Sequence, residues 1–132
     1  MMEVCCAIII REGKMLAVQK GPGSSHPWKW EFPGGKVKLL ESPEHCMVRE
    51  IEEELMVRIK VVQRLEAIEF DYGTKPFCLL PFVCRIASGE IHLTEHVAMH
   101  WMKGDEWESL DWAEADRQLI LKNKDRLKTL LL

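Results

Sequence analysis

Three glutamates in the middle of the chain, Glu50, Glu53 and Glu54, are spaced at i, i+3 and i+4. On a helix, this spacing brings the three side chains to one face. Like charges so spaced destabilise a helix by about 0.2–0.5 kcal/mol per pair, and acids in a last turn oppose the helix dipole. Local costs gathered in one place are typical of functional sites, and carboxylate oxygens are ligands that Mg²⁺ and Mn²⁺ prefer. The spacing alone leaves two readings open, a divalent-metal site or a solvated acidic face.

The sequence around these glutamates predicts where their helix begins and what precedes it. Ser42 is a good N-cap and Pro43 suits the first helical position. Before the helix, Gly34 and Gly35 let the backbone approach a ligand closely and can expose a carbonyl oxygen. Glu41 stands just before the N-cap and can fold back toward the helix. The buried side of the helix is predicted from an apolar stripe of Met47, Val48, Ile51 and Leu55.

Residues 35–57 resemble the Nudix box, whose pattern is glycine, five residues, glutamate, seven residues, then Arg-Glu-apolar-any-Glu-Glu-any-Gly-apolar. Gly35, Glu41, Arg49 and the three helical glutamates match every fixed polar position. Residues 30–36, Trp-Glu-Phe-Pro-Gly-Gly-Lys, are similar to the MutT-like subgroup, which acts on nucleoside triphosphates. The late glycine of the pattern is Met56 here, at a position where a left-handed conformation is common. Keeping that conformation would cost about 1–2 kcal/mol; otherwise the helix ends differently.

The resemblance implies a fold, an activity and a set of roles. The fold is an α/β Nudix α/β/α sandwich, with a mixed β-sheet flanked by the Nudix helix and a C-terminal helix. The activity is Mg²⁺-dependent hydrolysis of nucleoside triphosphates to a monophosphate and pyrophosphate, with Mn²⁺ as a possible substitute, in nucleotide-pool sanitation and DNA repair. Gly35 and Glu41 would support the loop. The implied metal ligands are Gly34 through its carbonyl, Glu50, Glu53, Glu54 and Glu95, and the implied catalytic residues are Glu50, Glu53, Arg49 and Glu95.

Other residues are candidates for holding the nucleotide. Lys20 resembles a phosphate contact of MutT, with an exposed strand-end lysine as the alternative. Phe32 and Tyr72 are candidates to stack on a base, with core packing as the alternative. Asp116 stands where MutT has the asparagine that recognises 8-oxoguanine. Because an ionised Asp only accepts hydrogen bonds, it suits the amine of cytosine or adenine, so CTP or dCTP joins oxidised nucleotides as a candidate substrate; a helix cap is the alternative role for Asp116.

Three further candidates lie just before or within the last predicted strand. Glu95, before the last predicted strand, is either a functional acid or an exposed loop acid. His96 and His100 nearby are each interpreted as a structural histidine, with a catalytic role as the alternative.

The elements that must position these residues are visible in the hydrophobic pattern. We expect strands at residues 4–11, 15–19, 28–32, 57–70, 77–86 and 100–102, a sharp turn at 33–35, and an amphipathic helix at 116–131. The strand at 77–86 is nearly continuously apolar and should be buried on both faces. Strands interleaved with two helices predict a mixed sheet covered on both sides, in a single domain over residues 1–132.

Composition bounds the class of protein. The chain has 132 residues, 47% of them hydrophobic, and a formal net charge of −3, which argues against stable nucleic-acid binding. Five cysteines without a CxxC pair predict buried free thiols in a reducing compartment. The apolar N-terminus reads as a strand rather than a signal peptide, and no run approaches the roughly 20 apolar residues of a spanning helix. We expect a soluble cytoplasmic protein, monomer or homodimer, with a small-molecule nucleotide substrate and no membrane partner.

Two alternatives stay open at this point. One is a Nudix hydrolase of another nucleoside diphosphate derivative, such as ADP-ribose or a dinucleotide. The other is a non-catalytic Nudix domain that binds a nucleotide, which would release no pyrophosphate in the presence of Mg²⁺.

Overall fold

The computed structural model describes residues 1–132 and is built around a mixed β-sheet. Its central strand β1 (Met2–Arg11) runs parallel to β7 (Phe77–Ser88) and antiparallel to β2 (Lys14–Gln19) and β4 (Gly34–Lys36). The remaining strands pair with β2 or β7: β3 (Trp30–Glu31) and β8 (Ala98–Met102) with β2, and β5 (Arg58–Arg64) and β6 (Ile68–Phe70) with β7.

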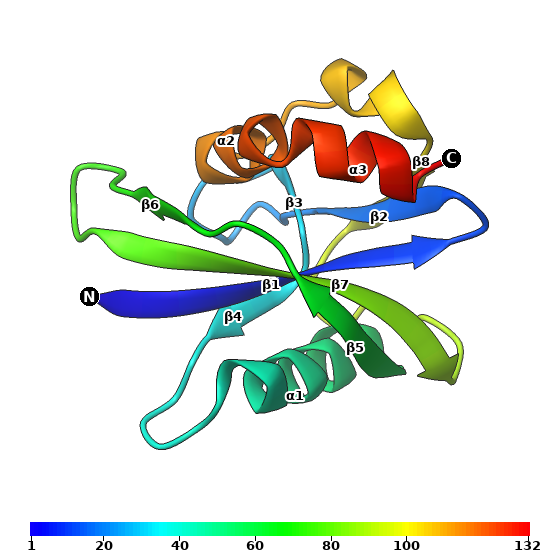
Figure 1. The fold of residues 1–132 in the computed structure, drawn as a ribbon. Helices are drawn as coiled ribbons and strands as arrows, with labels where there is room; N and C mark the ends of the chain where they lie inside the picture. The colour runs from blue at the N-terminus through cyan, green and yellow to red at the C-terminus, as the bar shows by residue number, and fades with distance from the viewer.

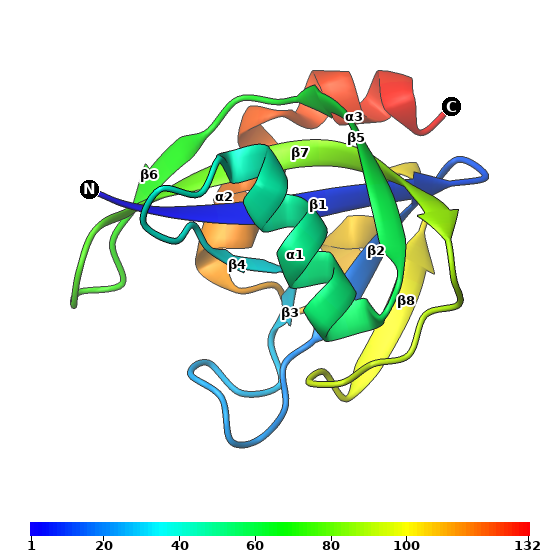
Figure 2. The ribbon, with the colours of Figure 1, turned by 90° about the horizontal axis from the view of Figure 1, so that it is seen from below.

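Helices cover both faces of the sheet (Figure 1). α1 (Pro43–Leu55) lies on one face, where Figure 2 shows it crossing over β1. α2 (Glu114–Lys122) and α3 (Lys124–Leu130) lie on the other face, preceded by a short 3-10 helix, η1 (Gly104–Ser109). This arrangement confirms the predicted α/β class with a mixed sheet between helices. None of the helices is long and apolar enough to span a membrane.

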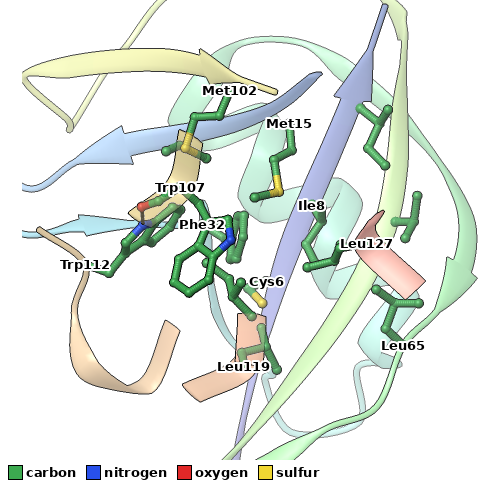
Figure 3. Packing of buried hydrophobic residues seen from close by; sticks show 14 of the residues in the cluster. Cys6, Ile8, Met15, Phe32, Leu65, Met102, Trp107, Trp112, Leu119 and Leu127 are labelled. Atoms are coloured by element: carbon green, nitrogen blue, oxygen red, sulfur yellow. Dashed lines mark hydrogen bonds between the residues drawn. The ribbon is translucent and has the colours of Figure 1, made fainter. Parts of the chain in front are cut away.

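Strand β1 separates two hydrophobic cores because successive side chains of a strand point to opposite faces. Cys5, Ala7 and Ile9 pack in the core under α1, whereas Cys6 and Ile8 pack in the core under α2 and α3. Figure 3 shows Cys6 next to Leu119 in the second core, with Ile8 further along the same strand. A strand buried on both faces explains the continuous apolar run at the N-terminus. All five cysteines are free, and four of them are buried.

α1 begins as the sequence predicts, and its C-terminal end takes one of the two forms that the sequence left open. The Ser42 hydroxyl accepts a hydrogen bond from the His45 backbone N–H at 3.1 Å, and Pro43 is the first helical residue. At the other end, Met56 adopts the left-handed conformation, with φ 59° and ψ 29°. The chain therefore keeps the geometry of the usual box glycine without the glycine. The Met56 side chain is exposed, so packing does not offset this strain.

Two expected elements are interrupted, and one side chain connects the interruptions. The strand expected at 57–70 breaks between β5 and β6, and the helix expected at 116–131 begins at Glu114 and breaks at Asn123. The buried Asn123 amide accepts from the Glu66 N–H and donates to the Glu66 and Leu119 carbonyls. The Asn123 side chain thus pairs the Glu66 backbone groups at the break between β5 and β6.

The glycine segment before α1 also differs from the expectation. Residues 34–36 form β4 beside β1 instead of a sharp turn, and the strand expected at 28–32 is confined to β3. A Cβ on Gly34 would overlap the carbonyl oxygen of Cys5. Only glycine therefore allows β4 to pair this closely with β1.

Candidate active site

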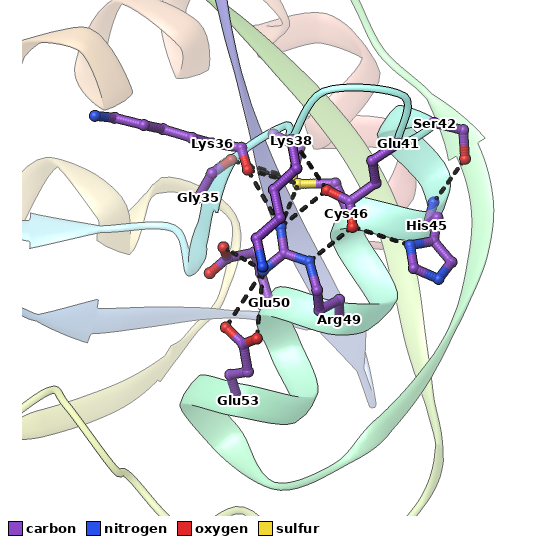
Figure 4. Close-up of polar contacts among 11 residues, drawn as sticks. Gly35, Lys36, Lys38, Glu41, Ser42, His45, Cys46, Arg49, Glu50 and Glu53 are labelled. Atoms are coloured by element: carbon purple, nitrogen blue, oxygen red, sulfur yellow. Dashed lines mark hydrogen bonds and ion pairs between the residues drawn. The ribbon is translucent and has the colours of Figure 1, made fainter.

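Arg49 joins the acidic face of α1 to the loop before it (Figure 4). Its guanidinium donates two hydrogen bonds to the Glu41 carboxylate, from Nε at 2.7 Å and from Nη2 at 2.9 Å. Nη1 donates to Glu50 at 2.8 Å and lies 3.3 Å from a Glu53 oxygen. Paired hydrogen bonds between charged groups are short and directional. Arg49 holds the pKa of Glu41 well below its usual range through these bonds.

Glu41 closes the loop that precedes the helix. Its carboxylate accepts a hydrogen bond from the Lys38 backbone N–H at 3.1 Å and lies 2.9 Å from His45 Nδ1. Arg49 adds a hydrogen bond to the carbonyl oxygen of Lys36 at 3.2 Å. The loop and the first turns of α1 are therefore held as one unit. A Cβ on Gly35 would overlap the Glu50 carboxylate, so a side chain at this position would displace Glu50 from its present place.

The three box glutamates lie in different environments. Glu53 is half-exposed and turns toward Arg49, whereas Glu54 is almost completely buried. Burial, together with Glu50 and the nearby charges of Glu95 and Glu31, raises the pKa of Glu54 to about 10. No three His, Cys, Asp or Glu side chains lie in a position to share one metal ion. The structure thus brings Glu50 and Glu54 together and turns Glu53 aside.

The segment between β7 and β8 crosses the C-terminal end of α1, as Figure 2 shows. The backbone N–H groups of His92 and Thr94 donate to the carbonyls of Leu55 and Glu54, at 2.9 and 3.1 Å. The Thr94 hydroxyl donates to the carbonyl of Glu53 at 2.7 Å. These bonds satisfy carbonyls that a helix end leaves without partners. They also place the exposed Glu95 close enough for its charge to raise the pKa of Glu54.

Two residues that the sequence did not single out for this site lie between the helix and the strands. His96 is buried, and its Nε2 lies 2.9 Å from a Glu31 carboxylate oxygen. Its Nδ1 lies 3.9 Å from a Glu54 oxygen and has no hydrogen-bond partner. Glu31 also lies 4.0 Å from Lys20 Nζ. The alternation of β3 offers a signal for Glu31, because Phe32 faces a core and its neighbour must face the other side.

A cavity of about 650 Å³ opens beside this region. All four residues proposed from the sequence to hold the nucleotide line it, namely Lys20, Phe32, Tyr72 and Asp116. Phe32 is nevertheless only 2% exposed and packs against Trp112, with ring centroids 5.0 Å apart. The Tyr72 hydroxyl accepts a hydrogen bond from the Ala115 backbone N–H at 2.8 Å. Gly34 and Gly35 line the same cavity, as do Lys36 and Lys75, which add positive charge to it.

Asp116 does not cap the C-terminal helix. The N-cap of α2 is Ala113, and the Asp116 carboxylate accepts a hydrogen bond from the Phe32 backbone N–H at 2.9 Å. Burial raises the pKa of Asp116 to about 8, and the charge of Glu31 acts in the same direction. A raised pKa favours the protonated form of Asp116, whereas the sequence led us to expect an ionised acceptor. A protonated carboxyl can donate a hydrogen bond as well as accept one.

A family model described as the NUDIX domain matches residues 1–123. The chain belongs to this family. The Nudix protein is 32% identical over 120 residues to the CTP pyrophosphohydrolase of Escherichia coli K12, covering 91% of this chain and 89% of that protein. It is 26% identical over 124 residues to the 8-oxo-dGTP diphosphatase of the same organism, covering 93% and 96%.

Solved structures agree with the family assignment. The solution structure of the E. coli ORF135 protein matches with a TM-score of 0.79 at 31% identity, over 91% of this chain and 86% of that chain. A MutT Nudix hydrolase from Burkholderia pseudomallei matches with a TM-score of 0.78 at 26% identity, over 91% and 95%. The predicted MutT-like Nudix resemblance and the pyrophosphohydrolase class are confirmed. The roles of individual residues stay predictions.

Proposed function

We propose that this Nudix protein is a Mg²⁺-dependent nucleoside triphosphate pyrophosphohydrolase that contributes to nucleotide-pool sanitation, with residues 1–132 acting as one hydrolase domain. One observation carries this proposal. Gly35 lines the large cavity and also abuts the carboxylate of Glu50 on the acidic helix. A nucleotide in the cavity would therefore have its phosphates next to the carboxylates that are suited to metal binding.

The side chains around Glu54 fit a hard divalent cation in type and in charge. Glu50, Glu54 and Glu95 carry oxygen ligands, and burial followed by the neighbouring carboxylates raises the pKa of Glu54, so a cation here would favour its ionised form. Glu53 and the carbonyl of Gly34 would complete the set that holds Mg²⁺ or Mn²⁺. The bound metal would neutralise phosphate charge and lower the pKa of a water molecule.

The chain's own residues would orient the reaction. Arg49 holds Glu50 in place through a 2.8 Å hydrogen bond and is itself fixed by Glu41. Glu95, placed by Thr94 beside the buried carboxylate of Glu54, would accept a proton from the attacking water or bind metal. Lys20 lines the cavity and would contact a phosphate. The products would be a nucleoside monophosphate and pyrophosphate.

Asp116 supports a preference among bases. With its raised pKa, its carboxyl would both accept and donate a hydrogen bond near neutral pH. Cytosine presents an amine donor beside a ring-nitrogen acceptor, which matches this pair. The relative with 32% identity is named a CTP pyrophosphohydrolase, and this agrees with the chemistry of Asp116. We therefore propose CTP and dCTP as leading substrates, with oxidised nucleotides next.

A pyrophosphate-release screen tests this function. The panel would hold normal and oxidised nucleoside triphosphates, ADP-ribose and dinucleotides, each with Mg²⁺, with Mn²⁺ and with EDTA. We expect metal-dependent pyrophosphate release from nucleoside triphosphates, highest for CTP or dCTP. Turnover of ADP-ribose or dinucleotides alone would replace the proposed substrate class, and no turnover at all would favour a non-catalytic domain. A clear preference for 8-oxo-dGTP would contradict the role given to Asp116.

A further inference from the structure

His96 occupies a bridging position between two carboxylates that belong to different elements. Its side chain is 3% exposed, and its two ring nitrogens face Glu31 of β3 and Glu54 of α1. The Nε2–Glu31 distance is 2.9 Å, within hydrogen-bonding range. The Nδ1–Glu54 distance is 3.9 Å, too long for a hydrogen bond. Nε2 is therefore within hydrogen-bonding distance of Glu31, whereas Nδ1 faces Glu54 without a hydrogen bond.

The unpaired nitrogen is unusual for this molecule. His96 Nδ1 is the only buried side-chain nitrogen or oxygen in the chain that has no hydrogen-bond partner. Buried polar atoms are nearly always paired, because leaving one unpaired costs free energy. An exception next to a proposed metal ligand therefore calls for a functional explanation.

The backbone on both sides of His96 is fixed, so the ring has a defined place. Thr94 is anchored to the end of α1 by hydrogen bonds to the carbonyls of Glu53 and Glu54. The Val97 N–H donates to the carbonyl of Gln19 at 3.0 Å, and β8 begins at the next residue. A ring held from both sides can orient a neighbouring carboxylate with little loss of freedom when that carboxylate binds a ligand.

We propose that His96 is a positioning residue that holds the Glu54 carboxylate toward the metal-binding face of α1, with Glu31 fixing the imidazole from behind. The contact to Glu54 would shorten when Glu54 binds a cation, which would give Nδ1 the partner that it lacks. This inference rests on the proposed function and assigns roles to two residues outside the Nudix box. Residues that orient a metal ligand typically change metal affinity or activity by about 10–100-fold when they are replaced.

Paired substitutions separate the two faces of the imidazole. His96→Asn keeps an amide near the position of Nδ1, and His96→Gln keeps one near the position of Nε2. Mn²⁺ binding to the purified full chain, measured by electron paramagnetic resonance without nucleotide, should weaken by about tenfold in His96→Gln and less in His96→Asn. His100→Gln, at an exposed position in the middle of β8, serves as the matched control and should bind Mn²⁺ like the wild type. Equal affinities in the two His96 variants, both normal or both weakened, would overturn the proposal.

A measurement on the wild-type chain does not depend on whether these variants fold. The ¹⁵N resonances of the His96 ring are followed while Mg²⁺ is added. We expect the Nδ1 resonance to shift more than the Nε2 resonance, with the ring of His100 unchanged. Saturable Mg²⁺ binding that leaves both nitrogens of His96 unmoved would overturn the positioning role while leaving the proposed function intact. Absence of any Mg²⁺ or Mn²⁺ binding by the wild-type chain would instead remove the proposed function, and this inference with it.

Discussion

Two clusters of charge on the same helix differ in how completely they are paired. Around Arg49, the carboxylates of Glu41 and Glu50 both accept hydrogen bonds from one guanidinium, and the pKa of Glu41 is lowered. Glu54 itself has no Lys or Arg partner, and burial, together with the neighbouring acids, raises its pKa to about 10. In the first cluster, Glu41 and Glu50 are paired with Arg49 within the chain, and we call these three residues the clamp. The second remains short of positive charge, which is what a site built for a divalent cation requires.

We expect the largest effect from removing the buried carboxylate of Glu54. Glu54→Gln deletes a proposed metal ligand. Because a metal contributes several kcal/mol of transition-state stabilisation, we expect kcat to fall by about 10³-fold in the pyrophosphate-release assay.

The same variant should be more stable than the wild type without metal. The folded-state pKa of Glu54 is raised, so its contribution to stability is greatest below the unfolded pKa of about 4.3 and is lost as the pH rises toward 10. At pH 8 in EDTA, thermal unfolding of Glu54→Gln should therefore occur at a higher temperature. A loss of both activity and stability would mean that Glu54 has a structural role instead.

Weakening the complete cluster should have the opposite effect on stability. Arg49→Lys keeps the charge but cannot donate to Glu41 from two nitrogens while also reaching Glu50. We expect a lower melting temperature and a kcat reduced by about 10–100-fold, as for other residues that orient metal ligands. Arg58→Lys is the matched control, because Arg58 makes only an exposed contact of 3.7 Å with Glu52. Equal effects of the two substitutions would argue against a special role for the clamp.

Asp116 is a buried carboxyl that we do not assign to metal binding. It therefore tests whether burial alone makes stability depend on pH. Its pKa is raised from about 3.9 in the unfolded chain to about 8 in the folded chain. The unfolded state therefore loses its proton first, and stability falls between these values, with a limiting slope of about 1.4 kcal/mol per pH unit. Asp116→Asn removes this dependence, so its stability advantage should grow from pH 4 to pH 8 in urea unfolding. A difference that stays constant with pH would show that Asp116 is ionised in the folded state.

Met56 should give the smallest effect and should leave the chemistry unchanged. Met56→Gly relieves a left-handed strain of about 1–2 kcal/mol and adds about 0.5–1 kcal/mol of chain entropy to the unfolded state. We expect a net gain of about 0.5–1 kcal/mol in the free energy of unfolding, with kcat unchanged. A change in kcat would show that Met56 takes part in shaping the acidic face.

Local patterns made the Nudix helix predictable from sequence. The Ser42 cap, the apolar stripe and the spacing of the glutamates all lie within a few turns of one another. The interruptions at residues 65–67 and at Asn123 were not predictable in this way, because Asn123 bonds to a residue 57 positions away. The glycines of β4 predict a turn when only the sequence is considered. Their close approach to β1, which allows a strand, is visible only in the structure.

The candidate active site also has a part that local sequence patterns predict and a part that they do not. Glu41, Arg49 and Glu50 are recognisable from spacing, because they stand near one another in the sequence. The bridge from Glu31 through His96 joins residues 65 positions apart, and Asp116 reaches the Phe32 backbone across 84 positions. These contacts depend on how β3, β8 and α2 pack, and no local pattern encodes them. The raised pKa of Asp116 is a consequence of burial, which only the structure reveals.

We propose that the acidic face of α1 catalyses the metal-dependent hydrolysis of a nucleoside triphosphate to a monophosphate and pyrophosphate. The most direct test compares the wild type with Glu53→Gln in the pyrophosphate-release assay, at saturating Mg²⁺ and with CTP as substrate. Because Glu53 is half-exposed, near-ultraviolet circular dichroism should show an unchanged fold. We predict that wild-type turnover requires the metal and that kcat falls by orders of magnitude in the variant. Near-normal turnover by a folded Glu53→Gln protein would contradict the assignment.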